Sequence, residues 1–248
     1  MSKIAREIIL LLIVCQLLYR NGNLPNVSSY SNDLLMGNDS NWLKSEMVLV
    51  LSPKKQSTIS KGSFQDMLEA LGVRETGLLS GNPNQYQFEN PLSFIGKYQF
   101  GEILLIRLGY YKADVYYGRG ADKNYWRGTW TKKKGIDSKL KFLNTPNVQE
   151  EAIREAFRVY WKDINDLLTQ QGKSVNNYLG HKKTFNDKGK SKTITITLSG
   201  IIAGAHLRGP DQVVNLLVTA KVSHDEFGTS ILEYMEMFGG YDMRIEDL

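Results

Sequence analysis

A glutamate at the end of an apolar helical stripe is the residue of this chain best suited to chemistry. Glu75 shares one helix face with three apolar residues: Phe64, Leu68 and Leu71. Burial on that face and the negative end of the helix dipole both favour the protonated carboxyl group, which a general acid needs in order to donate to a leaving oxygen. The alternative is a surface glutamate that pairs with Arg74 or Lys97.

The elements that must position this glutamate are expected to be mainly helical. Ser63 and Asp66 have the spacing of a capping box, and Gly77 is a typical C-terminal stop, so the first helix should run between them. The remaining pattern predicts a helix near 99–108, a long helix over 148–171, a hairpin over 184–198, and a helix capped by Ser199 that runs to Leu207. The aromatic, glycine-rich tract 110–131 is expected to be irregular. The predicted fold class is mainly α with a small β-hairpin.

Composition limits the kind of protein. The chain has 248 residues with 31 Lys and Arg against 26 Asp and Glu, and its net charge of +5 favours an anionic partner such as a bacterial cell wall. Cys15 is the single cysteine, so an intrachain disulfide is excluded. The three histidines are far apart and show no metal-ligand spacing, and no phosphate-binding glycine loop is present. We therefore expect neither a metal nor a cofactor.

The first 62 residues differ from the rest. An apolar run of 12 residues, 8–19, follows Lys3 and Arg6, and it is shorter than the roughly 20 residues that span a bilayer. It resembles the apolar part of a secretory signal without a small-x-small cleavage site; membrane association or a buried helix are the alternatives. Residues 20–62 are rich in Asn, Ser, Gly and Lys and predict a linker. We accordingly divide the chain into an N-terminal segment, 1–62, and a domain, 63–248.

Three short motifs occur in an order found in one superfamily. They are RETG at 74–77, GKYQF at 96–100 and AHLRGP at 205–210. They resemble the E-[ST]-G, G-x-x-Q and A-Y-N-A-G-P motifs of lytic transglycosylases and goose-type lysozymes, over roughly residues 63–240. His206 and Leu207 stand where that family has Tyr and Asn. With WRGTW at 126–130, the pattern resembles a branch of the lysozyme-like superfamily.

The resemblance implies a lysozyme-like domain that cuts the glycan strands of peptidoglycan between N-acetylmuramic acid and N-acetylglucosamine. Glu75 would act as general acid and then as base. The candidates for substrate contacts in its cleft are Thr76, Tyr98, Gln99 and His206. Core packing is the alternative for Tyr98. Attack by the sugar's own 6-hydroxyl would make the protein a lytic transglycosylase, and attack by water would make it a muramidase.

A second carboxylate would distinguish these reactions. An inverting hydrolase needs one roughly 6.5–9.5 Å from the acid in order to hold water. Glu102 is the first candidate, because it lies three residues after Gln99 on the predicted helix, and Glu89 and Asp114 are others. The alternative for Glu102 is a structural pair with Arg107.

Aromatic residues in the tract 110–131 are candidates for sugar binding. Tyr125, Trp126 and Trp130 fall in a predicted loop, where exposed rings suit stacking against pyranose rings. A small satellite core under the loop is the alternative. Basic residues interleave with these rings, as in single-strand nucleic-acid binders, but nucleic acid is not the partner that we expect.

Two other functions stay open. One is a non-catalytic cell-wall-binding protein, which the altered His206–Leu207 pair favours; the other is a chitinase-like hydrolase, since E-T-G also occurs in such enzymes. Under every one of these hypotheses the partner is a glycan strand, and peptidoglycan is the one expected. The expected location is periplasmic or secreted, with anchoring through residues 8–19 or delivery into another cell as variants.

Overall fold

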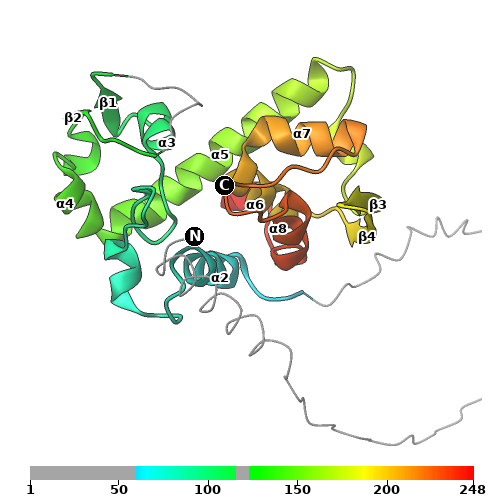
Figure 1. The fold of residues 1–248 in the computed structure, drawn as a ribbon, viewed down its shortest axis with the longest axis horizontal. Coiled ribbons are helices and arrows are strands. Elements are labelled where there is room, and N and C mark those ends of the chain that lie inside the picture. Colours follow the sequence, from blue (N-terminus) through cyan, green and yellow to red (C-terminus); the bar gives the residue numbers. More distant parts are fainter. Residues whose placement is uncertain (1–59, 116–122) are drawn as a thin grey trace, which may run out of the picture. The chain divides into compact units, whose positions relative to one another are not determined.

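The computed structural model describes residues 60–115 and 123–248, all of which belong to one compact unit, 55–248. The described part is mainly helical, with seven α-helices and two small antiparallel hairpins (Figure 1). None of its helices has the length and apolarity to cross a lipid bilayer. The predictions for the apolar run 8–19 and for most of the linker concern residues outside the described part.

The first described helix, α2, spans Phe64–Thr76 and matches its prediction. The Ser63 hydroxyl accepts the Asp66 N–H and the Asp66 carboxylate accepts the Ser63 N–H, which completes the capping box. Gly77 ends the helix in the left-handed conformation, with φ of 69°. The three apolar residues of the predicted stripe are buried: Phe64, Leu68 and Leu71.

The segment after α2 departs from its prediction. A 3-10 turn, Pro83–Gln87, precedes helix α3, which spans only Glu102–Arg107. Gln99 lies outside the helix, because its φ of 48° is left-handed and Ile95 and Phe100 pair in a β-bridge around it. The predicted helix start at 99 is therefore wrong by three residues.

The tract 110–131 is not wholly irregular, contrary to the prediction. Strands β1, Tyr111–Ala113, and β2, Gly128–Trp130, form an antiparallel hairpin. The strands approach closely at Gly128, where a Cβ atom would lie 2.2 Å from the Lys112 carbonyl oxygen. The hairpin leads through a 3-10 turn, Lys133–Gly135, and helix α4, Lys139–Leu143, into the long helix.

The long helix α5 spans Pro146–Thr169, within two residues of its predicted bounds. A 3-10 turn, Val175–Asn177, follows, and then the predicted hairpin forms from β3, Lys182–Asp187, and β4, Lys190–Thr195. Three helices and a last 3-10 turn complete the chain: α6, Leu198–Arg208; α7, Pro210–Thr219; α8, Ile231–Met237; and Ile245–Asp247.

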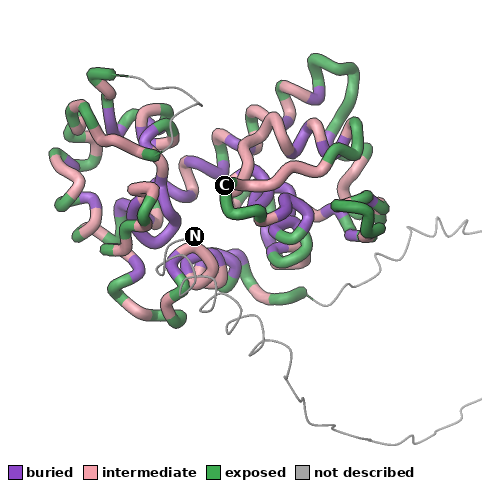
Figure 2. Tube along the Cα trace, in the orientation of Figure 1, coloured by how far each residue is buried: buried purple, intermediate pink, exposed green. Residues whose placement is uncertain are grey.

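Helix α6 is largely buried and brings the His206 side chain into the interior. It packs against α5, α7 and α8, and its residues from Ser199 to Ala205 are all buried (Figure 2). Gly200 lets α8 approach, because a Cβ atom there would lie 2.6 Å from the Met235 carbonyl oxygen. Thr197 caps this helix through the Gly200 N–H, so the prediction of Ser199 as the cap is wrong by two residues.

Candidate active site around Glu75

The Glu75 carboxylate lies in the last turn of α2 and is held from α8. The Tyr234 hydroxyl donates to Glu75 Oε1 at 2.5 Å, and the Glu75 side chain is 15% exposed. Among the described residues, none donates a hydrogen bond to Oε2. Arg74 lies over the Tyr234 ring, 5.6 Å from its centroid, and Lys97 pairs with other carboxylates. The alternative of a surface ion pair between Glu75 and either of these cations is therefore wrong.

His206 lies beside the same carboxylate oxygen but is not its hydrogen-bond partner. Its Nε2 is 3.8 Å from Glu75 Oε1 and 3.0 Å from the Tyr98 carbonyl oxygen. A carbonyl can only accept, so Nε2 carries the hydrogen and Nδ1 is the bare nitrogen. Burial is the main reason that the pKa of His206 is below its usual value, and the ring is neutral at pH 7. His206 thus links the end of α6 to the 96–99 segment.

Thr76 follows Glu75 with its hydroxyl already used. Its Oγ1 donates to the Gly72 carbonyl at 2.7 Å and accepts the Leu78 N–H at 3.2 Å, and the residue is 7% exposed. Thr76 therefore fixes the end of α2 and the direction of the chain after the catalytic candidate. In this arrangement its hydroxyl is not available to a sugar.

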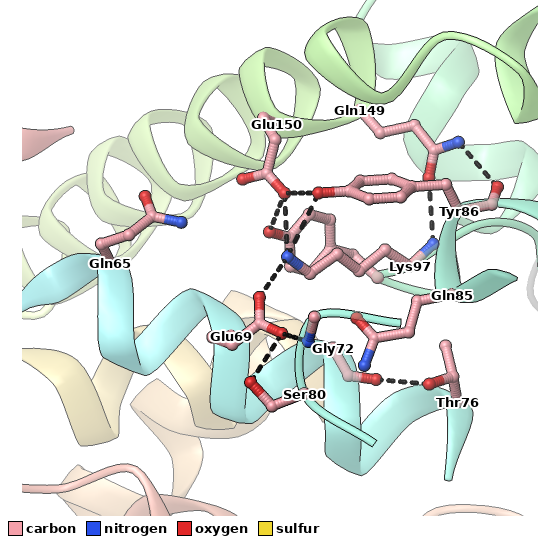
Figure 3. Close-up of polar contacts among 12 residues, drawn as sticks. Gln65, Glu69, Gly72, Thr76, Ser80, Gln85, Tyr86, Lys97, Gln149 and Glu150 are labelled. Atoms are coloured by element: carbon pink, nitrogen blue, oxygen red, sulfur yellow. Dashed lines mark hydrogen bonds and ion pairs between the residues drawn. The ribbon is translucent and has the colours of Figure 1, made fainter. Parts of the chain in front are cut away.

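The turn at Gly96 and Lys97 is built around a buried amide of α5 (Figure 3). Gln149 is fully buried; its Oε1 accepts the Lys97 N–H at 2.9 Å, while its Nε2 donates to the carbonyls of Tyr86 and Phe142. Gly96 has φ of 76°, and a Cβ atom there would lie 2.2 Å from Gln149 Oε1. The first residue of the G-x-x-Q-like motif must therefore be glycine for two independent reasons.

A buried ammonium ties the same turn to two helices (Figure 3). Lys97 Nζ lies 2.7 Å from Glu69 Oε2 on α2 and 3.0 Å from Glu150 Oε1 on α5, with 3% of the lysine side chain exposed. The Tyr86 and Tyr98 hydroxyls donate to the same Glu150 oxygen, each at 2.7 Å. Burial opposes the charge of Lys97, but its bonds to the two carboxylates outweigh this and raise its pKa.

Tyr98 and Gln99 are both buried, but Tyr98 belongs to the core, whereas Gln99 has one side-chain atom without a hydrogen-bond partner among the described residues. Tyr98 is fully buried, and burial together with the Glu150 charge raises its pKa far above the usual value, so its ring belongs to the core. Gln99 donates from Nε2 to the Gly96 carbonyl at 2.9 Å, while its Oε1 is buried without a partner. For Tyr98 the contact that reaches the Glu75 region is its backbone carbonyl, through His206.

Glu102 faces the aromatic loop. It is 7% exposed, and its Oε2 accepts the backbone N–H groups of Tyr125 at 3.2 Å and Trp126 at 3.4 Å. Its Oε1 is buried without a partner. Arg107, the expected alternative partner, instead pairs with Asp163.

The other second-carboxylate candidates lie apart from these contacts. Glu89 forms an ion pair with Lys139 at 2.9 Å, with about a third of each side chain exposed. Asp114 follows strand β1, and its backbone N–H donates to the Arg127 carbonyl. No hydrogen bond or ion pair within the described ranges joins Glu75 to Glu102, Glu89 or Asp114.

The two tryptophans form part of an aromatic cluster on the core. The rings of Trp126 and Trp130 stack with their centroids 5.8 Å apart and their planes at 14°, and Tyr111 meets both edge-on. Both are half-buried, and Trp126 Nε1 donates to the Ser93 carbonyl at 2.8 Å. The cationic groups of Lys123 and Arg127 each lie 5.4 Å from the centroid of the Tyr125 ring.

Reasoning from the sequence missed the residues that hold the site from a distance. Tyr234 is 159 positions from Glu75, and Glu150 is 53 positions from Lys97. No pattern in the sequence predicts that Gln149 and Glu150 contact residues 96–98. The sequence indicates only that both residues lie near the start of a long helix. Within 60–115 and 123–248, no cluster of His, Cys, Asp and Glu could hold a metal ion.

The three motifs nevertheless meet in space. RETG contributes Glu75, AHLRGP contributes His206, and GKYQF contributes the Tyr98 carbonyl. The His206 Nε2 lies 3.8 Å from the Glu75 carboxylate and 3.0 Å from the Tyr98 carbonyl oxygen. This arrangement can hold a carboxyl group that is partly shielded from water next to a neutral imidazole. Comparisons with models of known families, with curated proteins and with solved structures find no match to this chain.

Proposed function

We propose that this protein cleaves the glycan strands of peptidoglycan, at the linkage between N-acetylmuramic acid and N-acetylglucosamine, with a lysozyme-like domain. The observation that carries the proposal is the convergence of the three motifs on Glu75. Residues separated by 108 positions, Tyr98 and His206, are bonded directly, and His206 lies 3.8 Å from the Glu75 carboxylate. For an ordinary surface glutamate, we would not expect three motifs that are far apart in the sequence to lie close to its carboxylate.

The geometry suits Glu75 as the proton donor. Tyr234 donates to Oε1, which leaves Oε2, the oxygen without a donor among the described residues, as the position from which a proton would be donated. The half-buried position strengthens electrostatic contacts with the reacting sugar. The neutral His206 adds no cation that would draw the carboxyl group into an ion pair.

The reaction needs one protein carboxylate if the sugar supplies the nucleophile. Glu75 protonates the glycosidic oxygen, and the bond from that oxygen to the muramic acid C1 breaks. The resulting carboxylate then takes the proton from the muramic acid 6-hydroxyl, whose oxygen bonds to C1 and gives a 1,6-anhydro end. Glu102 is buried and bound to the loop N–H groups, which favours this single-carboxylate route over an inverting hydrolase.

The proposed reaction uses no metal or cofactor, and its partner is the glycan strand itself. The net charge of +5 is compatible with the anionic cell wall. Such a substrate would place the protein in the periplasm or outside the cell.

The test is the cleavage of purified peptidoglycan by the Glu75→Gln variant, with mass spectrometry of the released fragments. Glutamine keeps the shape and can accept the Tyr234 hydrogen bond but cannot donate an acid proton, so we expect the rate to fall by about 10² to 10⁴. Glu151→Gln is the control, since that glutamate is 54% exposed on α5. Anhydro ends from the wild type indicate a transglycosylase and reducing ends a hydrolase. Unchanged cleavage by folded Glu75→Gln would refute the assignment.

A non-catalytic wall-binding protein is the second candidate. It is favoured by His206, which stands in place of the family's Tyr and is only 4% exposed in its side chain, so it offers no contact to a substrate acetamido group. A binder of this kind would sediment with cell-wall sacculi and release no fragments. Chitin oligomers, as a competing substrate, test the chitinase-like alternative in the same assay.

A further inference from the structure

Glu102 and the loop 124–130 cap one another. Helix α3 begins after Gly101, which has no side chain to cap it, and the Asn124 Oδ1 accepts the Glu102 N–H at 2.6 Å instead. In return, the Glu102 Oε2 accepts the N–H groups of Tyr125 and Trp126. This is the reciprocal pattern of a capping box, here formed between a helix and a distant loop.

The loop is fixed to a second anchor at 92–93. The Asn124 backbone N–H and its Nδ2 both donate to the Leu92 carbonyl, at 2.9 and 3.1 Å. The Trp126 indole N–H donates to the neighbouring Ser93 carbonyl at 2.8 Å. Asn124 therefore holds α3 and the 92–93 turn at once, and the Trp126 side chain is oriented from the same turn.

The backbone of Trp126 is strained. Its φ of 53° is left-handed, a conformation that a residue with a bulky side chain adopts only where the surroundings impose it. The Glu102 carboxylate binds the N–H of this residue, and the Ser93 carbonyl binds its ring. The indole of this residue stacks on that of Trp130, with 14° between the ring planes.

We propose that Glu102 is a positioning residue that holds Trp126 and Trp130 as an aromatic wall for a sugar of the glycan strand. This rests on the proposed function, and it gives Glu102 a role other than that of a second catalytic carboxylate. The buried carboxylate acts through the loop backbone, and the half-buried rings supply the apolar face against which a pyranose stacks.

A positioning role and a catalytic role of Glu102 predict different effects of Glu102→Gln and Glu102→Ala on sugar binding and activity. A glutamine at 102 keeps a carbonyl oxygen that can accept the two N–H groups, whereas an alanine removes the acceptor. For a positioning residue, Glu102→Gln should keep sugar binding within about threefold and Glu102→Ala should weaken it at least tenfold, as expected when a charge-assisted hydrogen bond is lost. For a catalytic residue, glutamine would be as inactive as alanine and sugar binding would be unchanged in both.

The experiment uses the full-length chain with Glu75→Gln as background, so that cleavage is too slow to disturb the binding measurement. A tetrasaccharide of alternating N-acetylglucosamine and N-acetylmuramic acid is titrated against tryptophan fluorescence, and near-UV circular dichroism reports the stacked indoles. Asn124→Ala is the second variant, because it breaks the same reciprocal cap without changing residue 102. Binding is expressed per folded molecule, with thermal unfolding measured alongside, so that loss of fold is not scored as loss of affinity.

We expect Glu102→Ala and Asn124→Ala to weaken binding and to reduce the indole dichroism together, while Glu102→Gln retains both. In the chain with Glu75 intact, KM should rise for Glu102→Ala and kcat should stay within a few-fold. Unchanged affinity in folded Glu102→Ala would overturn the inference, as would a kcat collapse in Glu102→Gln with binding intact. If the wild type binds the sugar but does not cleave it, the proposed function is wrong, whereas the inference that Trp126 and Trp130 bind a sugar is retained.

Discussion

Replacing Lys97 by methionine should cost about 3 kcal/mol of the free energy of unfolding. The Lys97 side chain is 3% exposed, and its ammonium is the cation shared by Glu69 and Glu150. Its removal leaves two carboxylates facing one another without a counter-charge, and breaking a buried pair in this way costs about 3–5 kcal/mol. The carboxylates keep 27% and 21% exposure, so water screens part of their repulsion, and we expect the lower end of that range.

Urea unfolding at pH 7, followed by circular dichroism, measures this loss. Lys139→Met is the matched control, because the Lys139 side chain is 37% exposed in its pair with Glu89 and such surface pairs contribute about 0–1 kcal/mol. In a thermal scan the Lys97 variant should unfold roughly 6–12 °C below the wild type, at about 2–4 °C per kcal/mol for a domain of this size.

The loss should also depend on pH. Burial opposes the Glu69 charge, but hydrogen bonds from Lys97, Gly81 and Ser80 hold its pKa below 4.5, its ordinary value. A lowered pKa in the folded state gives stability that is present above 4.5 and is lost as the pH falls through the folded value. The difference in the free energy of unfolding between wild type and Lys97→Met should therefore become smaller below pH 4.5. A loss of under about 1 kcal/mol at pH 7, equal to that of Lys139→Met, would refute the reasoning.

Two further predictions concern the supports of the candidate site. Gly96→Ala and Gly109→Ala share a left-handed backbone, with φ of 76° and 77°, but only the first new Cβ would meet Gln149. Urea unfolding should show Gly96→Ala to be less stable than Gly109→Ala by about 1–3 kcal/mol, which is the cost of a buried polar group without its partner. Equal losses of stability in the two variants would contradict the close packing of Gly96 against Gln149. The pKa of His206 is lowered mainly by burial, so its neutral form contributes stability above pH 6.5 that is lost as the pH falls. Between pH 6.5 and 5.5 the free energy of unfolding should fall more for the wild type than for His206→Gln, and parallel pH curves would contradict a buried neutral histidine.

The candidate acid could be found from the sequence, but its environment could not. Glu75 follows from an apolar stripe and two helix-end signals that act within a few residues. The Tyr234 hydroxyl that holds it comes from 159 positions away. The sequence offers Lys97 only as an alternative surface partner for Glu75, whereas burial between α2 and α5 makes it the counter-charge of Glu69 and Glu150.

The features that can be predicted from the sequence alone are those that depend on local interactions. The capping box of α2, its glycine stop and the β3–β4 hairpin all rest on contacts between near neighbours. The capping box and the glycine stop formed where predicted, and the hairpin formed within three residues of its predicted bounds. Features that need a partner distant in the sequence depend on the folded chain. The β1–β2 strands paired at Gly128, and Glu102 turned to the loop at 124–126. In each case a backbone or side-chain polar group found its hydrogen bond far along the chain, and burial made that bond obligatory.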